Sequence, residues 1–186
     1  LCEFVNCVRS TGVRHMLIHA RKCILNGISA QANRTIPPLH YEVVHRLTRD
    51  FPDMKFTLNG GVLSLDECLE HLAPTDSLGS EGDFCGLFGD GSDGPLPPCH
   101  GVMVGRFPWH DPWALRCADS KLFGDEAGDP MAGRTRRDLI DDYVDYASAM
   151  QERHGCLKTA RATPGFPNGS FGWPSTSILK PLLGLF

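Results

Sequence analysis

Three short segments constrain the fold of this chain, because each joins an apolar, strand-like run to a turn or to a helix start. They are His19–Lys22, Asn59–Gly61 and Gly101–Arg106. A repeated order of strand and helix builds parallel sheets, whose strands all end at one edge. The sequence therefore predicts an α/β fold in which these segments meet at the carboxyl ends of neighbouring strands.

Hydrophobic periodicity alternates between helical and strand-like spacing before this third segment. In chain order, the predicted elements are a helix at 3–10, a strand at 15–18, a helix at 41–47, a strand at 55–58, a helix at 64–72 and a strand at 101–104. The first strand is a continuous apolar run, which predicts burial on both faces. Ser64 followed by Glu67 forms a capping box, which predicts that a helix starts at Ser64.

Residues 74–98 interrupt this alternation. They hold five acidic residues, no Lys or Arg, and a dense run of Gly and Pro. Because long structureless loops are uncommon in compact folds, we expect a mobile, low-complexity insertion here. With these five carboxylates set aside, the net charge changes from −4 to +1. Basic residues gather in residues 14–50, as on a surface that binds a polyanion, although an ordinary solvated face has the same composition.

The pattern changes after the third strand, because no further strand signal follows it. Helices are predicted at residues 112–117, 137–147 and 175–186. The sequence thus predicts an α/β domain at residues 1–119 and a helical domain at residues 120–186. The chain begins without a leader and stops inside an apolar segment, so we expect a fragment whose second domain is truncated.

Composition excludes several classes of protein. No apolar run approaches the roughly 20 residues of a membrane helix, so we expect no membrane partner. The eight cysteines follow neither a disulfide framework nor a zinc spacing. We therefore expect reduced thiols in an intracellular protein and no metal site.

Two glycine-containing turns, Asn59–Gly61 and Gly105–Arg106, offer the groups that an anionic cofactor needs. Glycine lets a ligand approach backbone amides, Arg106 adds a planar cation, and the Asn59 side chain can both donate and accept. His19, at the end of the first strand, can donate to a ring oxygen or a phosphate. Each feature by itself also fits a plain strand-ending turn, a surface arginine or a structural histidine.

The ordered set of these motifs resembles the tRNA-dihydrouridine synthases, specifically their A (20/20a) subfamily. The resemblance spans about residues 1–120. It is carried by the stretch His19–Leu39 and then by Tyr41, Asp50–Pro52, Asn59–Gly61 and Gly101–Arg106.

The resemblance implies an FMN-binding TIM (β/α)8 barrel, of which residues 1–119 would carry about strands six to eight, followed by a helical tRNA-binding domain at residues 120–186. It implies FMN contacts at His19, Asn59, Gly60, Gly61, Gly105 and Arg106. It implies tRNA contacts at Arg21, Lys22, Gln31 and Arg34. A lysine is usual in the family where this chain has Gln31. The family's catalytic cysteine lies in an Asn-x-Gly-Cys-Pro loop, and no such string occurs in this chain, so no catalytic residue is expected in it.

The activity implied is the FMN-dependent reduction of uridine to 5,6-dihydrouridine in the D-loop of tRNA, with NADPH as the reductant. We expect it of the complete protein, a monomer in the cytoplasm or in an organelle such as a chloroplast or mitochondrion. These residues alone should be inactive, because three strands cannot close an eight-stranded barrel. Two alternatives stay open: a noncatalytic RNA-binding remnant, and another FMN-dependent barrel oxidoreductase acting on a small molecule. The loop from Ala20 to Leu39 argues against the small-molecule alternative.

Overall fold

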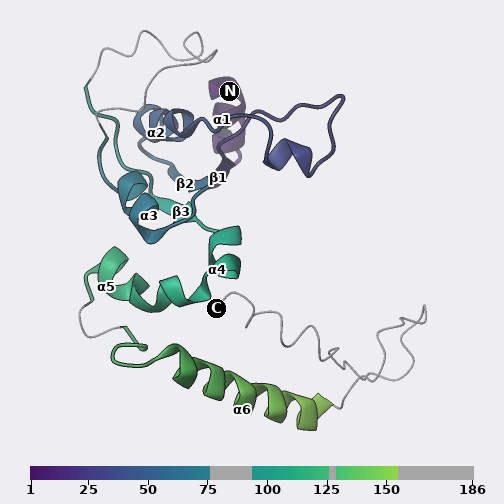
Figure 1. Ribbon diagram of the computed structural model, residues 1–186. Helices are drawn as coiled ribbons and strands as arrows, with labels where there is room; N and C mark the ends of the chain where they lie inside the picture. The colour runs from purple at the N-terminus through teal and green to yellow at the C-terminus, as the bar shows by residue number, and fades with distance from the viewer. Residues whose placement is uncertain (76–93, 126–128, 155–186) are drawn as a thin grey trace. The chain divides into compact units, whose positions relative to one another are not determined.

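A computed structural model describes residues 1–75, 94–125 and 129–154 of the chain (Figure 1). The chain divides into two compact units, Leu1–Gly105 and Arg106–Phe186. The division falls before the boundary at residues 119/120 that the sequence suggests, so residues 106–119 group with the helices that follow them. The assignment of the two domains to cofactor and RNA binding stays a prediction.

A parallel three-stranded sheet forms the centre of the first unit. Its strands are β1 (His15–His19), β2 (Lys55–Asn59) and β3 (Gly101–Met103), and their order in the sheet is β1-β2-β3. Helix α2 (Tyr41–Asp50) lies between β1 and β2 in the chain, and α3 (Leu65–Leu72) lies between β2 and β3. The predicted α/β class with a parallel sheet is therefore confirmed.

The core of this unit lies on one face of the sheet. Phe56 and Leu58 alternate along β2 and are both fully buried, while their neighbour Thr57 is half-buried. Val44 and Leu47 of α2 are fully buried, and so is Val5 of helix α1 (Cys2–Ser10). The helices therefore cover the Phe56 face, in keeping with the contacts between α2 and β2 and between α3 and β3.

The expected burial of β1 on both faces is wrong for the described residues. Leu17 is 57% exposed, whereas its neighbours Met16 and Ile18 are half-buried. Met103 of β3 is also exposed. The cause is that β1 is an edge strand, and no described element covers the face of the sheet that carries Leu17.

The capping box at the start of α3 is confirmed. The Ser64 hydroxyl accepts a hydrogen bond from the Glu67 amide at 3.0 Å. The Glu67 carboxylate accepts in return from the amide of Leu63 at 2.7 Å, one residue before the cap. These bonds satisfy amides that a helix start leaves without partners, so α3 begins at Leu65 directly after the turn that ends β2.

The second unit is helical where it is described. It contains α4 (Arg106–His110), the 3₁₀ helix η2 (Pro112–Cys117), α5 (Ala118–Phe123) and α6 (Arg136–His154). The helices predicted at 112–117 and 137–147 are confirmed, and the one at 175–186 lies outside the described residues. None of the helices described in either unit is both long enough and apolar enough to cross a membrane.

The described ends of the predicted insertion belong to the folded unit. Thr75 and Leu96 pair as an antiparallel bridge, with amide-to-carbonyl distances of 3.1 and 2.9 Å. The carbonyl of Pro97 accepts a hydrogen bond from the His45 ring at 2.8 Å. The expectation of a mobile insertion at 74–98 falls mostly on residues 76–93, which lie outside the described residues.

This pairing predicts which deletion the fold tolerates. Replacing residues 76–93 of the complete protein with a two-residue Asn-Gly linker should leave the free energy of unfolding within about 1 kcal/mol, because the bridge already holds the ends together. Removing residues 74–98 with the same linker should cost more, since it also removes the bridge and the acceptor of His45. Urea unfolding of both variants measures the difference. Equal stabilities of the two variants would contradict a structural role for the bridge.

Candidate functional site

The carboxyl ends of β1 and β2 meet in register. His19 pairs with Asn59, and Asn59 pairs in turn with Met103 of β3. The amide of Ala20 donates to the Asn59 carbonyl at 2.8 Å, so the pairing continues one residue past β1. The expectation that the three strand ends share one edge is confirmed, and it brings His19 beside the turn that follows β2.

That turn requires glycine at two successive positions. Gly60 and Gly61 have φ angles of 117° and 76°, in the left-handed region that side chains disfavour. A Cβ on Gly60 would lie 3.0 Å from Cε1 of His19, and a Cβ on Gly61 would collide with Cδ1 of Leu39. The His19 ring therefore lies against the Gly60 backbone.

The Gly60–Gly61 peptide is held from one side. The Tyr41 hydroxyl donates to the Gly60 carbonyl at 2.9 Å. Because a trans peptide directs its N–H away from its C=O, the Gly61 amide faces away from Tyr41. Within the described part of the chain, this amide forms no hydrogen bond. Together with the His19 ring and the Asn59 side chain, it can offer hydrogen bonds to an anion or to a ring carbonyl.

The third predicted segment is open. Gly105 ends the first unit, and a Cβ built on it would meet no atom within 4 Å. Arg106 begins α4 and belongs to the second unit, whereas His19 and Asn59 belong to the first. Among the described residues, no hydrogen bond or ion pair engages its exposed guanidinium. Because α4 has five residues, the arginine charge and not the helix end is what this segment offers an anion.

The loop after β1 is closed at its base. Arg21 and Leu39 form an antiparallel bridge, and the His40 amide donates to the Ala20 carbonyl at 2.8 Å. The Arg21 guanidinium donates to the carbonyl of Pro37 and contacts that of Thr35 at 3.5 Å. This half-buried side chain therefore holds the loop together and is not turned toward solvent.

A side-chain amide organises the tip of the same loop. The Asn33 amide donates to the Ile24 carbonyl and accepts from the Ile24 amide, both at 2.8 Å. Asn33 belongs to the 3₁₀ helix η1 (Ala32–Arg34). Of the predicted RNA contacts, Arg34 lies in this helix and Gln31 directly precedes it. Lys22, Gln31 and Arg34 are all exposed.

An apolar tip on this loop was missed by the sequence reasoning. The exposed fractions are 41% for Ile24, 86% for Leu25 and 67% for Ile36. Its signal is visible in the sequence, because the loop predicted at 20–38 carries branched apolar residues such as Ile24 and Leu25 where no strand or helix is predicted to bury them. Exposed apolar side chains beside cations can contact bases while the cations contact phosphates.

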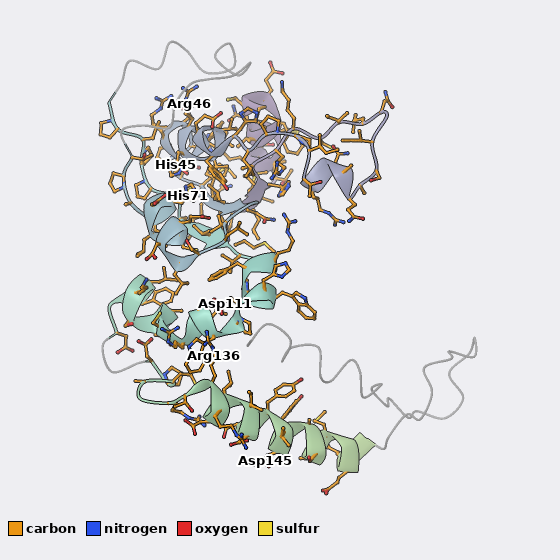
Figure 2. All side chains as sticks on the ribbon, viewed as in Figure 1. His45, Arg46, His71, Asp111, Arg136 and Asp145 are labelled. Carbon is orange, nitrogen blue, oxygen red and sulfur yellow. The ribbon has the colours of Figure 1, made fainter. Side chains whose placement is uncertain are left out.

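A buried histidine pair was also missed. His45 of α2 and His71 of α3 are 0% and 7% exposed, and Figure 2 shows their side chains between the two helices. Because the Pro97 carbonyl only accepts, Nδ1 of His45 must carry a proton. Its Nε2 then accepts from Nδ1 of His71 at 3.3 Å. The sequence indicates this burial only through the position of His45 on the apolar stripe of its helix.

Neither of the two buried thiols among the described residues is set up for thiolate chemistry. Burial raises the pKa of the Cys99 thiol to about 12 and also raises the pKa of Cys68, with the Glu67 charge adding to the second effect. Both therefore stay protonated near neutral pH. The cysteines that the structure describes are all free, and no group of metal-ligating side chains occurs among the described residues.

Comparison with known proteins identifies relatives of this chain. Residues 1–80 match the family described as dihydrouridine synthase (Dus). The tRNA-dihydrouridine(20/20a) synthase of Pseudomonas aeruginosa is 42% identical over 127 residues, which cover 68% of this chain and 31% of that protein. The Pseudomonas putida protein of the same name is 39% identical over 157 residues, covering 84% of the chain and 38% of the relative.

The Escherichia coli K12 protein of that name is 38% identical over 135 residues, covering 71% of the chain and 32% of the relative. This chain thus spans about a third of the length of the curated relatives it matches.

The histidine pair predicts a pH-dependent stability. Burial lowers the pKa of both His45 and His71 from 6.5, and the His45 charge lowers the pKa of His71 further. Just below pH 6.5 the unfolded chain binds more protons than the folded chain. The free energy of unfolding is therefore largest above about pH 6.5 and falls as the pH decreases through the lowered pKa values. Urea unfolding from about pH 7.5 to about pH 5.5 should show this loss. A double replacement of both histidines by Leu should reduce the slope, and the exposed His110→Gln change should not.

Proposed function

This chain belongs to the dihydrouridine synthase family, and we propose on that basis that the complete protein reduces uridine to 5,6-dihydrouridine in the D-loop of tRNA, using FMN and NADPH. The observation that carries the proposal is the edge formed by His19, Asn59 and the Gly60–Gly61 turn. Its donors converge from two adjacent strand ends, where α/β sheets bind their ligands. The relatives named as tRNA-dihydrouridine(20/20a) synthases support the reaction and the substrate.

The donor set at this edge fits a flavin. An imidazole, a carboxamide and the Gly61 amide suit a ring with carbonyl oxygens and a phosphate tail. A Cβ on Gly60 would crowd the His19 ring, so glycine at this position lets the imidazole lie directly against the turn. Bound FMN would supply hydride-transfer chemistry, and Gly105 and Arg106 would hold its phosphate.

The loop that follows β1 fits a polyanionic partner. Lys22, Gln31 and Arg34 are exposed on a loop that its own hydrogen bonds keep in shape. Contacts to phosphates supply most of the affinity for RNA, and a preformed loop loses less entropy on binding. Arg21, the fourth residue expected to contact tRNA, supports the loop from inside, so its contribution to binding would be indirect.

The uncovered face of the sheet supports the rest of the proposal. Leu17 and Met103 are exposed on it, as expected if further strands of a TIM barrel cover it in the complete protein. We propose that the chain carries about strands six to eight, is inactive by itself, and continues into a helical tRNA-binding domain. The monomeric state and the compartment, cytoplasm or organelle, stay predictions.

A noncatalytic RNA-binding protein is the second candidate. The loop closed by Arg21 and Asn33 is folded through contacts within residues 21–39, so it could bind RNA without a cofactor. The two candidates differ in one measurement. The purified complete protein should show flavin absorbance and NADPH oxidation if it is a synthase, and tRNA binding alone if it is not.

Replacing Arg106 tests the phosphate contact. In the complete protein, Arg106→Ala should weaken FMN binding about tenfold or more, because a charge-assisted hydrogen bond is lost. Flavin absorbance after gel filtration and titration with FMN measure the effect. Arg153→Ala, which changes an exposed arginine of α6, serves as the control. Unchanged flavin retention in Arg106→Ala would remove this residue from the cofactor site.

Replacing Arg34 tests the RNA contact separately. Arg34→Ala should weaken tRNA binding and lower the slope of log affinity against log salt by about one, because one phosphate contact is lost. NADPH oxidation without tRNA should be unchanged. Arg14→Ala, which changes an exposed arginine before β1 at the opposite end of that strand, is the matched control. Equal losses of both activities in Arg34→Ala would refute a role confined to RNA.

A further inference from the structure

We propose that Tyr41 is a positioning residue for the flavin site, whose hydroxyl fixes the Gly60–Gly61 peptide so that the Gly61 amide is presented beside His19. The inference rests on the proposed function, since it assigns Tyr41 a role in holding FMN. It goes beyond that function because the role assigned to Tyr41 acts through the Gly60–Gly61 turn and not through a contact with FMN or tRNA. The hydrogen bond from the Tyr41 hydroxyl to the Gly60 carbonyl, at 2.9 Å, is its basis.

The turn needs such a restraint because of its composition. Two successive glycines have the widest backbone freedom of any dipeptide, and the peptide between them can rotate with little steric cost. In one orientation its amide faces the open edge, and in the opposite orientation its carbonyl does. A carbonyl there would repel the oxygens of a flavin or a phosphate. Fixing the Gly60 carbonyl therefore decides whether this edge donates or accepts hydrogen bonds.

Tyr41 is itself held in position by contacts on several sides. It is the first residue of α2, and the preceding His40 amide donates to the Ala20 carbonyl. Its ring packs edge-on against His71 of α3, with the ring centroids 4.4 Å apart and the planes at 60°. A Cβ on Gly61 would approach its hydroxyl oxygen to 2.8 Å, so the turn and the phenol are in close contact. The packing of α2 against α3 thus holds the Tyr41 ring in place, and the hydroxyl of that ring holds the turn.

The phenol acts as a lasting donor and not as an acid or base. Burial raises the pKa of Tyr41, and the nearby Glu67 charge raises it further, while the Arg21 charge opposes both effects. Its proton is already engaged by the Gly60 carbonyl. The hydrogen bond should therefore persist across the pH range in which the other groups of the site titrate.

The test is Tyr41→Phe in the complete protein, which removes the hydroxyl and keeps the ring against His71. We expect the Kd for FMN to rise about three- to tenfold, and the absorbance and fluorescence of bound flavin to change, because the peptide beside it becomes free to rotate. The KM for tRNA should be unchanged at saturating FMN. Tyr146→Phe, which removes an exposed hydroxyl on α6, is the control for FMN binding.

A second variant separates positioning from general stability. Gly61→Ala forces a methyl group against the Tyr41 hydroxyl as well as against Leu39, at a φ that disfavours side chains, so it should weaken FMN binding in part by displacing that hydroxyl. The double variant should then lose less than the product of the two single losses. Independent, multiplying losses would overturn the inference, as would a Tyr41→Phe protein that is less stable without FMN but binds it normally. If the wild-type complete protein binds no FMN, the proposed function itself fails.

Discussion

The pairing of β1 with β2 in parallel register is the constraint on which the rest of the site depends. It brings His19 opposite Asn59 and so carries the histidine ring to the backbone of Gly60. A shift of one residue would turn each side chain of β1 to the other face of the sheet. Such a shift would turn Met16 and Ile18 away from the helix-covered face that they share with Phe56 and Leu58, and would bring His15 and His19 onto it. The hydrophobic core thus fixes the geometry of a polar edge.

Around that edge, side chains hold turns and loops in place by hydrogen bonds to their backbone carbonyls. Tyr41 holds Gly60, Arg21 holds Pro37, and His45 holds Pro97. The bonds from Tyr41 and His45 join helix α2 to a turn and to a loop, and the bond from Arg21 closes the loop in which Arg21 lies. The neutral His45–His71 pair also joins the two helices that pack on the sheet, which makes the same region sensitive to protonation. The proposed flavin edge and RNA loop therefore share one supporting framework.

Much of the fold could be predicted from the sequence, because the signals were local. Periodicity located the predicted strands and helices of the first unit to within three residues, whereas α6 extends seven residues beyond its predicted end and α5 was not predicted. Ser64 with Glu67 indicated the start of α3. Burial of β1 on both faces could not be inferred correctly, since an apolar run reveals what a strand can bury and not what covers it. Arg21 shows the same limit for function. A charge beside a strand end suggests a ligand contact, yet its guanidinium meets two carbonyls of its own loop.

The sequence by itself determined the order of elements, the class of the sheet and the requirement for glycine after β2, because each depends on backbone preferences of neighbouring residues. Only the tertiary structure decided that Tyr41 meets Gly60, that His45 meets His71 and that Leu17 stays exposed. These outcomes join residues far apart in the chain. They depend on the angle and register at which helices pack on strands, which no local pattern encodes.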